Sequence, residues 1–140
     1  MYKVLLLVLL MPLTINSQNI FGKWKTIDDE TGEAKSTVEI YEQNGQVFGK
    51  IIEIYNSKNR DALCTNCEGA NYNKPVLGLT IINNLTQDGN YFKNGTIFDP
   101  EDGKTYKCRL SLDEDNPDIL LVRGYMSFFY ATQYWERIDG

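Results

Sequence analysis

Histidine is absent from this chain of 140 residues. Its absence excludes Ser-His-Asp and Cys-His catalysis, histidine-ligated zinc and a histidine pH switch. Positive charge is also scarce, because 14 Lys and Arg stand against 19 Asp and Glu, and the formal net charge is −5. A nucleic-acid partner is therefore not expected, since phosphate binding needs a basic face. The length fits one domain, and a hydrophobic content of 42% suffices for a globular core.

A continuous apolar run occurs at residues 4–13, directly after Lys3, and a polar stretch follows at 14–19. A short positive start, a short apolar run and a small residue at the break are typical of a secretory signal peptide. The alternative, a transmembrane anchor, needs about 20 apolar residues. We therefore predict a signal peptide at 1–17, cleaved after Ser17, and one exported domain at 18–140 without a transmembrane segment, periplasmic or secreted. With no Cys near the break, a lipid-modified N-terminus is not supported.

The rest of the chain reads as a series of short strands. Runs rich in Val, Ile, Tyr, Phe and Thr suit a pleated, half-buried surface. They are separated by residue pairs that supply the positive φ of tight turns, namely Thr31-Gly32, Asn44-Gly45, Asp88-Gly89, Asn94-Gly95 and Asp102-Gly103. The strongest hairpin signals are Asn44-Gly45 and Asp102-Gly103. We predict strands at 22–27, 36–43, 46–55, 78–83, 91–98, 104–112, 118–125 and 131–138.

About eight strands with mostly short connections indicate an all-β, antiparallel up-and-down barrel. A β-sandwich is the alternative, because the pattern alone does not separate the two. Closure into a barrel hides the strand edges that an exported sheet would otherwise expose. The one long connection, at 56–77, is polar and carries two cysteines. A connection of that length is usually functional or tied down.

Several stretches of the chain resemble known families. Gly22-Lys23-Trp24 near the start and Trp135-Glu136-Arg137 near the end resemble the lipocalin and calycin barrels, in which a Gly-x-Trp packs beneath a late arginine. The whole mature chain is more similar to an exported bacterial family, domain of unknown function 2147. The matching stretches are 22–26, 38–41, 95–108, 122–125 and 132–137. This resemblance implies a small, exported, lipocalin-like barrel, and it implies no activity.

The same resemblance assigns structural roles at the closed end of the barrel. Gly22 and Trp24 would start the first strand, and a guanidinium would stack on the indole to seal the barrel. Two arginines can supply that group, Arg123 and Arg137. Arg137 fits better, because in a closed barrel the last strand pairs with the first.

Cys64-Thr65-Asn66-Cys67 is the sharpest local motif. A structural disulfide that pins the long connection is the favoured interpretation, and a bridge from either cysteine to Cys108 is the second. A redox-active or metal-binding role is the third, but the loop is polar without helical continuation and no fourth metal ligand is evident. Cys108 shares a predicted inner face with Tyr106 and Leu110, where a free thiol is well accommodated.

No constellation for catalysis is apparent, and the chain is expected to be neither an enzyme nor a cofactor or metal protein. The acidic clusters at 28–30, 99–103 and 113–115 lack the spacing of a calcium loop. Residues 99–103 are better explained by turn chemistry. No nucleophile elbow and no phosphate-binding glycine loop is present.

Aromatic residues indicate a function more clearly than the acidic clusters do. Residues 124–130 form a dense apolar connection before the last strand. Tyr125, Phe128 and Phe129 are therefore candidate ligand-binding residues at the rim of an open lumen. In the alternatives, they only plug the barrel or form a patch for a partner protein. We expect either an exported barrel that binds a small apolar or amphipathic molecule, or a solid-filled envelope protein with a structural or interaction role.

Overall fold

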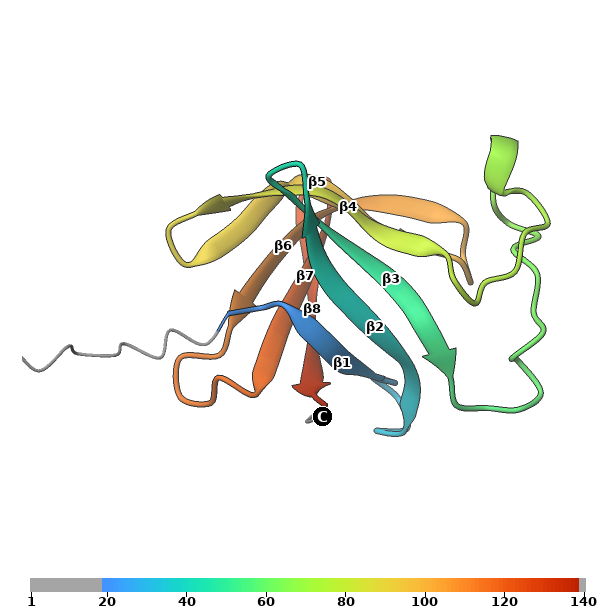
Figure 1. Cartoon of the computed structure of the whole chain (residues 1–140), viewed down its shortest axis with the longest axis horizontal. Coiled ribbons are helices and arrows are strands. Elements are labelled where there is room, and N and C mark those ends of the chain that lie inside the picture. The colour runs from blue at the N-terminus through green and yellow to red at the C-terminus, as the bar shows by residue number, and fades with distance from the viewer. Residues whose placement is uncertain (1–18, 139–140) are drawn as a thin grey trace, which may run out of the picture.

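The computed structural model describes residues 19–138 and shows eight β-strands in one closed barrel (Figure 1). Each strand pairs antiparallel with the next, and the last pairs with the first. The prediction of an up-and-down barrel is confirmed, and the β-sandwich alternative is wrong. The predicted signal peptide at 1–17 lies outside the described residues. The strands are β1 (Gly22–Ile27), β2 (Ala34–Gln43), β3 (Gln46–Ile54), β4 (Thr80–Asp88), β5 (Tyr91–Asp99), β6 (Lys104–Leu112), β7 (Ile119–Met126) and β8 (Phe129–Arg137).

Local turn chemistry explains the short hairpins. Asn44 and Gly45 adopt φ of 53° and 77° between β2 and β3, the conformation that a two-residue hairpin requires. Ser127 adopts φ 54° in the turn between β7 and β8. That turn is much shorter than the predicted connection, because β7 runs to Met126 and β8 begins at Phe129.

Two asparagines make the middle of the sheet differ from the prediction. Asn84 has φ 60° and lies inside β4, where the pairing with β3 shifts register. The strand therefore continues to Asp88 instead of ending at residue 83. Asn94 has φ 68° and also lies within a strand, β5, at a register shift before Gly95. A positive φ at Asn is compatible with a bulge as well as a turn, so this pair was wrongly interpreted as a turn signal.

The long connection, residues 55–79, extends from the side of the barrel and contains the short 3-10 helix η1 (Gly69–Asn71) (Figure 1). Its own backbone forms a small antiparallel bridge between Leu63 and Pro75. Asn66 Nδ2 donates to the carbonyl oxygen of Glu101 at 2.8 Å, which ties the connection to the β5–β6 turn. The chain therefore anchors its long connection to the barrel.

The hydrophobic core lies inside the barrel. Its largest fully buried side chains are Trp24 and Trp135, which lie on β1 and β8. The rest of the core cluster is aliphatic for the most part and includes Val38, Ile40, Ile82, Leu85, Leu110 and Leu120. Among residues 19–138, no helix is long and apolar enough to cross a membrane.

Candidate functional site

Trp24 and Arg137 seal one end of the barrel. Trp24 is completely buried, and its indole N–H donates to the carbonyl oxygen of Ile20 at 2.8 Å. The guanidinium carbon of Arg137 lies 4.4 Å from the centre of the indole ring, a cation–π geometry. The two residues are also direct partners in the β1–β8 pairing. The structure therefore places these two residues as the lipocalin resemblance implied.

Three chain segments meet at the Arg137 side chain. Its Nη2 donates to the carbonyl oxygens of Asn19 at 2.9 Å and Pro117 at 3.0 Å. Its Nε donates to the carboxylate of Asp118 at 3.2 Å. One planar guanidinium with several donors thus joins the N-terminal segment, the β6–β7 turn and the last strand. Gly22, the other predicted closure residue, begins β1 at φ 118°.

Arg123 does not take part in this seal. It pairs with Thr132 across β7 and β8, and its Nε donates to the Thr132 hydroxyl at 3.0 Å. Its guanidinium lies 4.3 Å from the ring centre of Tyr130. The neighbouring residue Val122 is buried in the core, and successive side chains of a strand point to opposite faces. Arg123 therefore lies on the outer face, and its assignment to barrel closure is wrong.

The inner face of β7 changes from buried to exposed away from the sealed end. Leu120 and Val122 belong to the buried core, whereas Gly124 is half-buried and Met126 is 50% exposed. Gly124 pairs with the buried Cys108, and cross-strand partners share a face of the sheet. The inner wall is thus accessible to solvent toward the β7–β8 turn.

The inner face of β8 shows the same change. Trp135 is buried and Gln133 half-buried, whereas Ala131 is exposed and Phe129 is 77% exposed. Trp135 is held in place by its indole N–H, which donates to the amide oxygen of Gln133 at 3.1 Å. The β1–β8 pairing involves only the last two residues of β8. Phe129, Ala131 and Gln133 therefore have no pairing partner on β1.

Small residues leave room on this open part of the wall. Gly124 and Ala131 face each other across β7 and β8. A Cβ added at Gly124 would lie 3.6 Å from the Cβ of Tyr106 and 3.9 Å from Cγ2 of Ile97, ordinary van der Waals distances. Ile97 and Tyr106 are themselves cross-strand partners and are half-buried. These four residues form an apolar inner surface that the core does not cover.

A polar group lies beside this surface. The hydroxyl of Tyr106 donates to the carboxylate of Asp102 in the β5–β6 turn. That hydrogen bond, with partial burial and the negative charges of Asp102 and Asp99, raises the pKa of Tyr106 to about 12. The hydrogen bond to Asp102 holds the phenol in one orientation beside the apolar surface.

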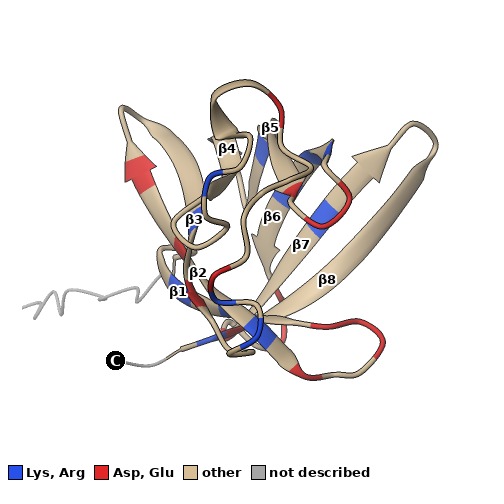
Figure 2. Ribbon diagram, turned by 90° about the vertical axis from the view of Figure 1, so that its right-hand side faces the viewer, with Lys and Arg blue, Asp and Glu red and all other residues tan. Residues whose placement is uncertain are grey.

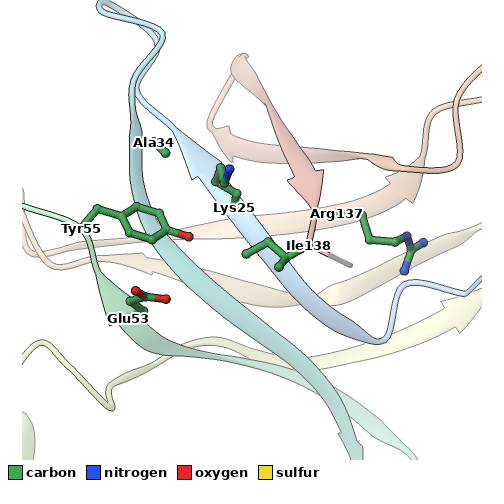
Figure 3. Close-up of a pocket in the computed structure, with 6 residues that line it drawn as sticks. All are labelled: Lys25, Ala34, Glu53, Tyr55, Arg137 and Ile138. Carbon is green, nitrogen blue, oxygen red and sulfur yellow. The ribbon is translucent and has the colours of Figure 1, made fainter. Parts of the chain in front are cut away.

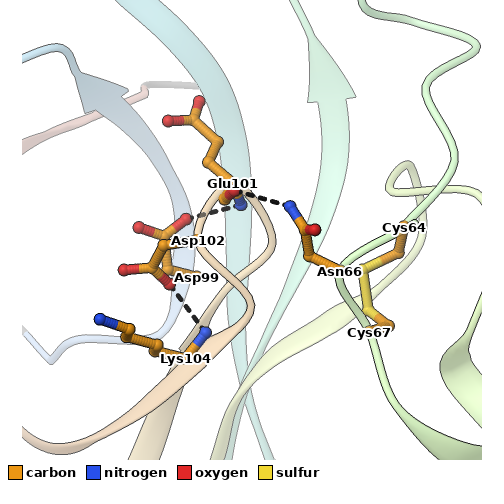
Figure 4. Close-up of a disulfide and its surroundings, with 7 residues drawn as sticks. All are labelled: Cys64, Asn66, Cys67, Asp99, Glu101, Asp102 and Lys104. Carbon is orange, nitrogen blue, oxygen red and sulfur yellow. Dashed lines mark hydrogen bonds between the residues drawn. A yellow bond between two sulfur atoms is a disulfide. The ribbon is translucent and has the colours of Figure 1, made fainter.

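The cysteines occupy two separate places. The expected disulfide between Cys64 and Cys67 is formed, and Cys108 is a buried free thiol. Desolvation by burial raises the pKa of Cys108 to about 12, so the thiol is not activated. Figure 4 shows the disulfide next to Asn66, whose side chain reaches the β5–β6 turn.

The three predicted ligand residues lie in different environments. Tyr125 pairs with Tyr130 and Lys107 on the outer face, and the two tyrosine rings are 6.0 Å apart. Its assignment to the lumen entrance is therefore wrong. Phe129 lies on the inner face, and Phe128 lies at the tip of the hairpin with 94% of its surface exposed. Because both phenylalanines are so exposed, they do not plug the barrel.

Sequence reasoning did not select Ile97, Gly124 and Ala131 as site residues. Tyr106 had been placed on the inner face by its alternation with Cys108. Ala131 could have been found only from its partner Gly124, which requires the register of the last hairpin. Small residues carry no chemical signal of their own, so the inner surface that they leave open was not visible in the sequence.

Two hollows of the structure lie on the outside of the barrel. One has a volume of about 540 Å³ and is lined by Lys25, Ala34, Glu53, Tyr55, Arg137 and Ile138 (Figure 3). The other, of about 260 Å³, lies between the long connection and the outer faces of β4, β5 and β6, and Cys67 and Asn83 line it. In the part of the chain that the structure describes, no cluster of three Cys, Asp or Glu residues is arranged to hold a metal ion.

These features define a lipocalin-like barrel that Trp24 and Arg137 seal at one end. A solved structure with the same fold is that of protein HP1028 from Helicobacter pylori, described as belonging to the lipocalin family. The two structures align with a TM-score of 0.73 over 86% of this chain and 84% of that chain, with 19% sequence identity. That level of identity establishes the fold alone. None of the curated proteins matches the chain.

Residues 22–137 match the family described as "Uncharacterized protein conserved in bacteria (DUF2147)". The match covers every strand of the barrel, and the chain belongs to this family. The expected family membership and the lipocalin-like fold are both confirmed.

Proposed function

We propose that this protein binds a small apolar or amphipathic molecule at the open end of its barrel. The observation that carries the proposal is the apolar inner surface at Ile97, Tyr106, Gly124 and Ala131, which the core leaves uncovered. The opposite end is filled by two buried tryptophans, so a ligand has one route of entry. The buried core occupies the interior beside the tryptophans, which favours a short ligand or the end of a longer chain.

The chemistry of the mouth supports an amphipathic ligand. Apolar surface that a ligand covers contributes about 25 cal/mol for each Å² removed from water. The Tyr106–Asp102 pair lies beside this surface and offers hydrogen-bonding groups for a polar end. No catalytic arrangement accompanies these groups in the described residues, and we propose a binding role without chemistry.

Export is part of the same proposal. The apolar run at residues 4–13 is typical of a signal peptide, and the Cys64–Cys67 disulfide is suited to an oxidising compartment. We therefore place the protein in the periplasm or outside the cell. Sequencing the N-terminus of the exported protein would test this, and an N-terminus other than Gln18 would contradict the predicted cleavage site.

Filling the inner surface tests the binding proposal. Ala131→Trp should lower the affinity for a naphthalene-type or fatty-acid fluorescent probe by about tenfold or more, because the indole would occupy the open wall. Tyr134→Trp is the matched control, since Tyr134 lies on the outer face of the same strand and is 57% exposed. It should bind the probe like the wild type. Equal binding by both variants would contradict the proposed site, with circular dichroism confirming that both are folded.

The second candidate is an interaction role with a filled barrel. It is favoured by the two outer hollows, one of which lies under the disulfide-bonded connection. Wild-type protein that takes up no probe while folded would favour this role over ligand binding. Cys64→Ser with Cys67→Ser should then weaken in vivo cross-linking to a partner at the envelope, whereas Cys108→Ser should leave that cross-linking unchanged.

A further inference from the structure

The tip of the β7–β8 hairpin exposes large apolar side chains. Phe128 and Phe129 are 94% and 77% exposed, the two highest values among the large hydrophobic residues of the described chain. Met126 and Tyr130 beside them are also exposed. Contiguous apolar side chains at one projecting point are typical of a contact surface, because exposing them to water is unfavourable.

The outer part of this hairpin has no charged side chains. Residues 124–135 contain no Asp, Glu, Lys or Arg. Figure 2 shows no blue or red on the ribbon at the outer end of this hairpin. A tip without charge can enter a hydrocarbon layer, where an ionised side chain at the centre costs several kcal/mol.

Three cations follow below the tip on the outer face of β6 and β7. They are Lys107, Arg109 and Arg123, which occupy two adjacent rows of the sheet. Within residues 19–138 only Lys35, Lys93 and Arg137 form ion pairs, so the three cations below the tip have no acidic partner. Arg109 stacks 4.3 Å from the ring centre of Tyr91, at the start of β5 and away from the tip. Lys107 and Arg123 are therefore the two cations of this group that are available for an external anion near the tip.

Tyrosines lie between the tip and the cations. Tyr125 and Tyr130 form the row with Lys107, and their hydroxyl-bearing rings are 6.0 Å apart. The guanidinium of Arg123 stacks 4.3 Å from the Tyr130 ring centre. Since Tyr130 is nearer to the turn than Thr132, the pairing partner of Arg123, this stacking directs the cation toward the tip.

The order along the hairpin matches the depth profile of a bilayer surface. Apolar side chains belong in the acyl region, tyrosines at the interface, and cations at the phosphates. We propose that the β7–β8 hairpin docks on a lipid bilayer with anionic headgroups, with Phe128 and Phe129 inserted. At about 3.3 Å per residue, the tyrosine row lies about 7 Å from the tip, which agrees with the 5–10 Å depth of interfacial insertion.

Three acids of the loops near the hairpin are paired within the protein. Lys35 binds the carboxylate of Glu101 at 2.7 Å and that of Asp28 at 3.8 Å. Asp102 accepts the hydrogen bond from Tyr106. Glu101, Asp28 and Asp102 therefore have partners within the protein, whereas Asp29 of the same β1–β2 loop accepts a hydrogen bond from the side-chain amide of Gln133 on β8 at 3.3 Å.

The docking surface adjoins the proposed ligand site, because Phe129 and Ala131 lie on the same inner face of β8. Vesicle flotation and probe binding are measured separately, so either proposal can fail without the other.

Vesicle flotation tests the proposal with the full exported protein. The two vesicles are phosphatidylcholine alone, and phosphatidylcholine with phosphatidylglycerol at about two to one. The wild type should float with the anionic vesicles, and raising salt from ~0.05 to ~0.5 M should reduce binding severalfold. Phe128→Ser with Phe129→Ser should abolish flotation. Tyr72→Ser, at a residue 61% exposed on the long connection, is the matched control and should float like the wild type.

A charge variant separates the two parts of the surface. Lys107→Gln with Arg123→Gln should lower binding to the anionic vesicles about tenfold and remove most of the salt dependence, with circular dichroism unchanged. Lack of flotation of the wild type with either vesicle would overturn the proposal, as would unchanged flotation of the double serine variant. The proposal would also be overturned if the wild type bound no vesicles but formed a dimer that Phe128→Ser with Phe129→Ser dissociates. The tip would then be a contact surface for a second copy of the chain.

Discussion

Replacing Trp24 with alanine tests the sealed end of the barrel. The side chain is fully buried, and a buried tryptophan removes about 150–250 Å² from water. At about 25 cal/mol per Å², the part lost on truncation corresponds to about 3–5 kcal/mol. The lost hydrogen bond to Ile20 adds about 1 kcal/mol, and the lost stacking with Arg137 adds about 0.5–1 kcal/mol.

Relaxation of the cavity and entry of water would recover part of this sum. We therefore expect Trp24→Ala to lower the free energy of unfolding by about 3–5 kcal/mol, a large share of the stability of a typical domain. The effect should be the same with and without a ligand probe, because Trp24 is at the end opposite the mouth. Trp24→Phe keeps most of the apolar area but loses the indole N–H, and it should cost about 1–2 kcal/mol.

Urea unfolding followed by the fluorescence of Trp135 measures these differences. Tyr134→Ala is the control, because an exposed outer side chain should contribute less than about 1 kcal/mol. If Trp24→Ala shifts the midpoint no more than this control does, the reasoning on the sealed end is refuted.

Three further predictions concern the cysteines and glycines. Thiol titration of exported protein should detect no reactive group in the native state and one, Cys108, in denaturant. After reduction it should detect three. Three reactive thiols before reduction would contradict the Cys64–Cys67 bridge. Because burial raises the pKa of Cys108 from 9.0 to about 12, its stabilising effect is complete below pH 9 and decreases above it. Between pH 9 and 11 the wild type should lose about 2–3 kcal/mol more than Cys108→Ala, measured by urea unfolding, and parallel losses would contradict this assignment. Gly95→Ala should lower the free energy of unfolding by more than about 2 kcal/mol, because the added Cβ would clash with the backbone carbonyl of Asn83. Gly124→Ala should change it by less than about 0.5 kcal/mol, because the added Cβ meets its neighbours at ordinary distances. Equal urea midpoints for the two variants would refute the packing argument.

Local features of the sequence determined most of the strand framework. Successive side chains of a strand point to opposite faces, so apolar and polar residues alternate along a half-buried strand. Asn-Gly in a two-residue turn favours a hairpin. The β2–β3 and β5–β6 hairpins were therefore predicted close to their observed positions. The Cys64–Cys67 disulfide was also predictable, since two cysteines three residues apart can meet within one turn.

Asn84 and Asn94 mark the limit of such local reasoning. Both have the positive φ of a turn residue, yet both lie inside strands. Whether an asparagine with positive φ ends a strand or forms a bulge depends on the hydrogen bonds of its neighbours. Those neighbours lie on other strands, so the sequence around each asparagine could not decide.

Only the tertiary structure distinguished the roles of the arginines and aromatics near the end of the chain. Arg123 and Arg137 have the same side chain, but Arg137 faces Trp24 because β8 meets β1 in one particular register. Likewise, Tyr125 and Phe129 belong to one hairpin but lie on opposite faces. A shift of one residue in register would exchange the two faces of a strand. Register follows from the closure of the whole barrel, and for this reason the open inner surface and the exposed tip emerged only with the fold.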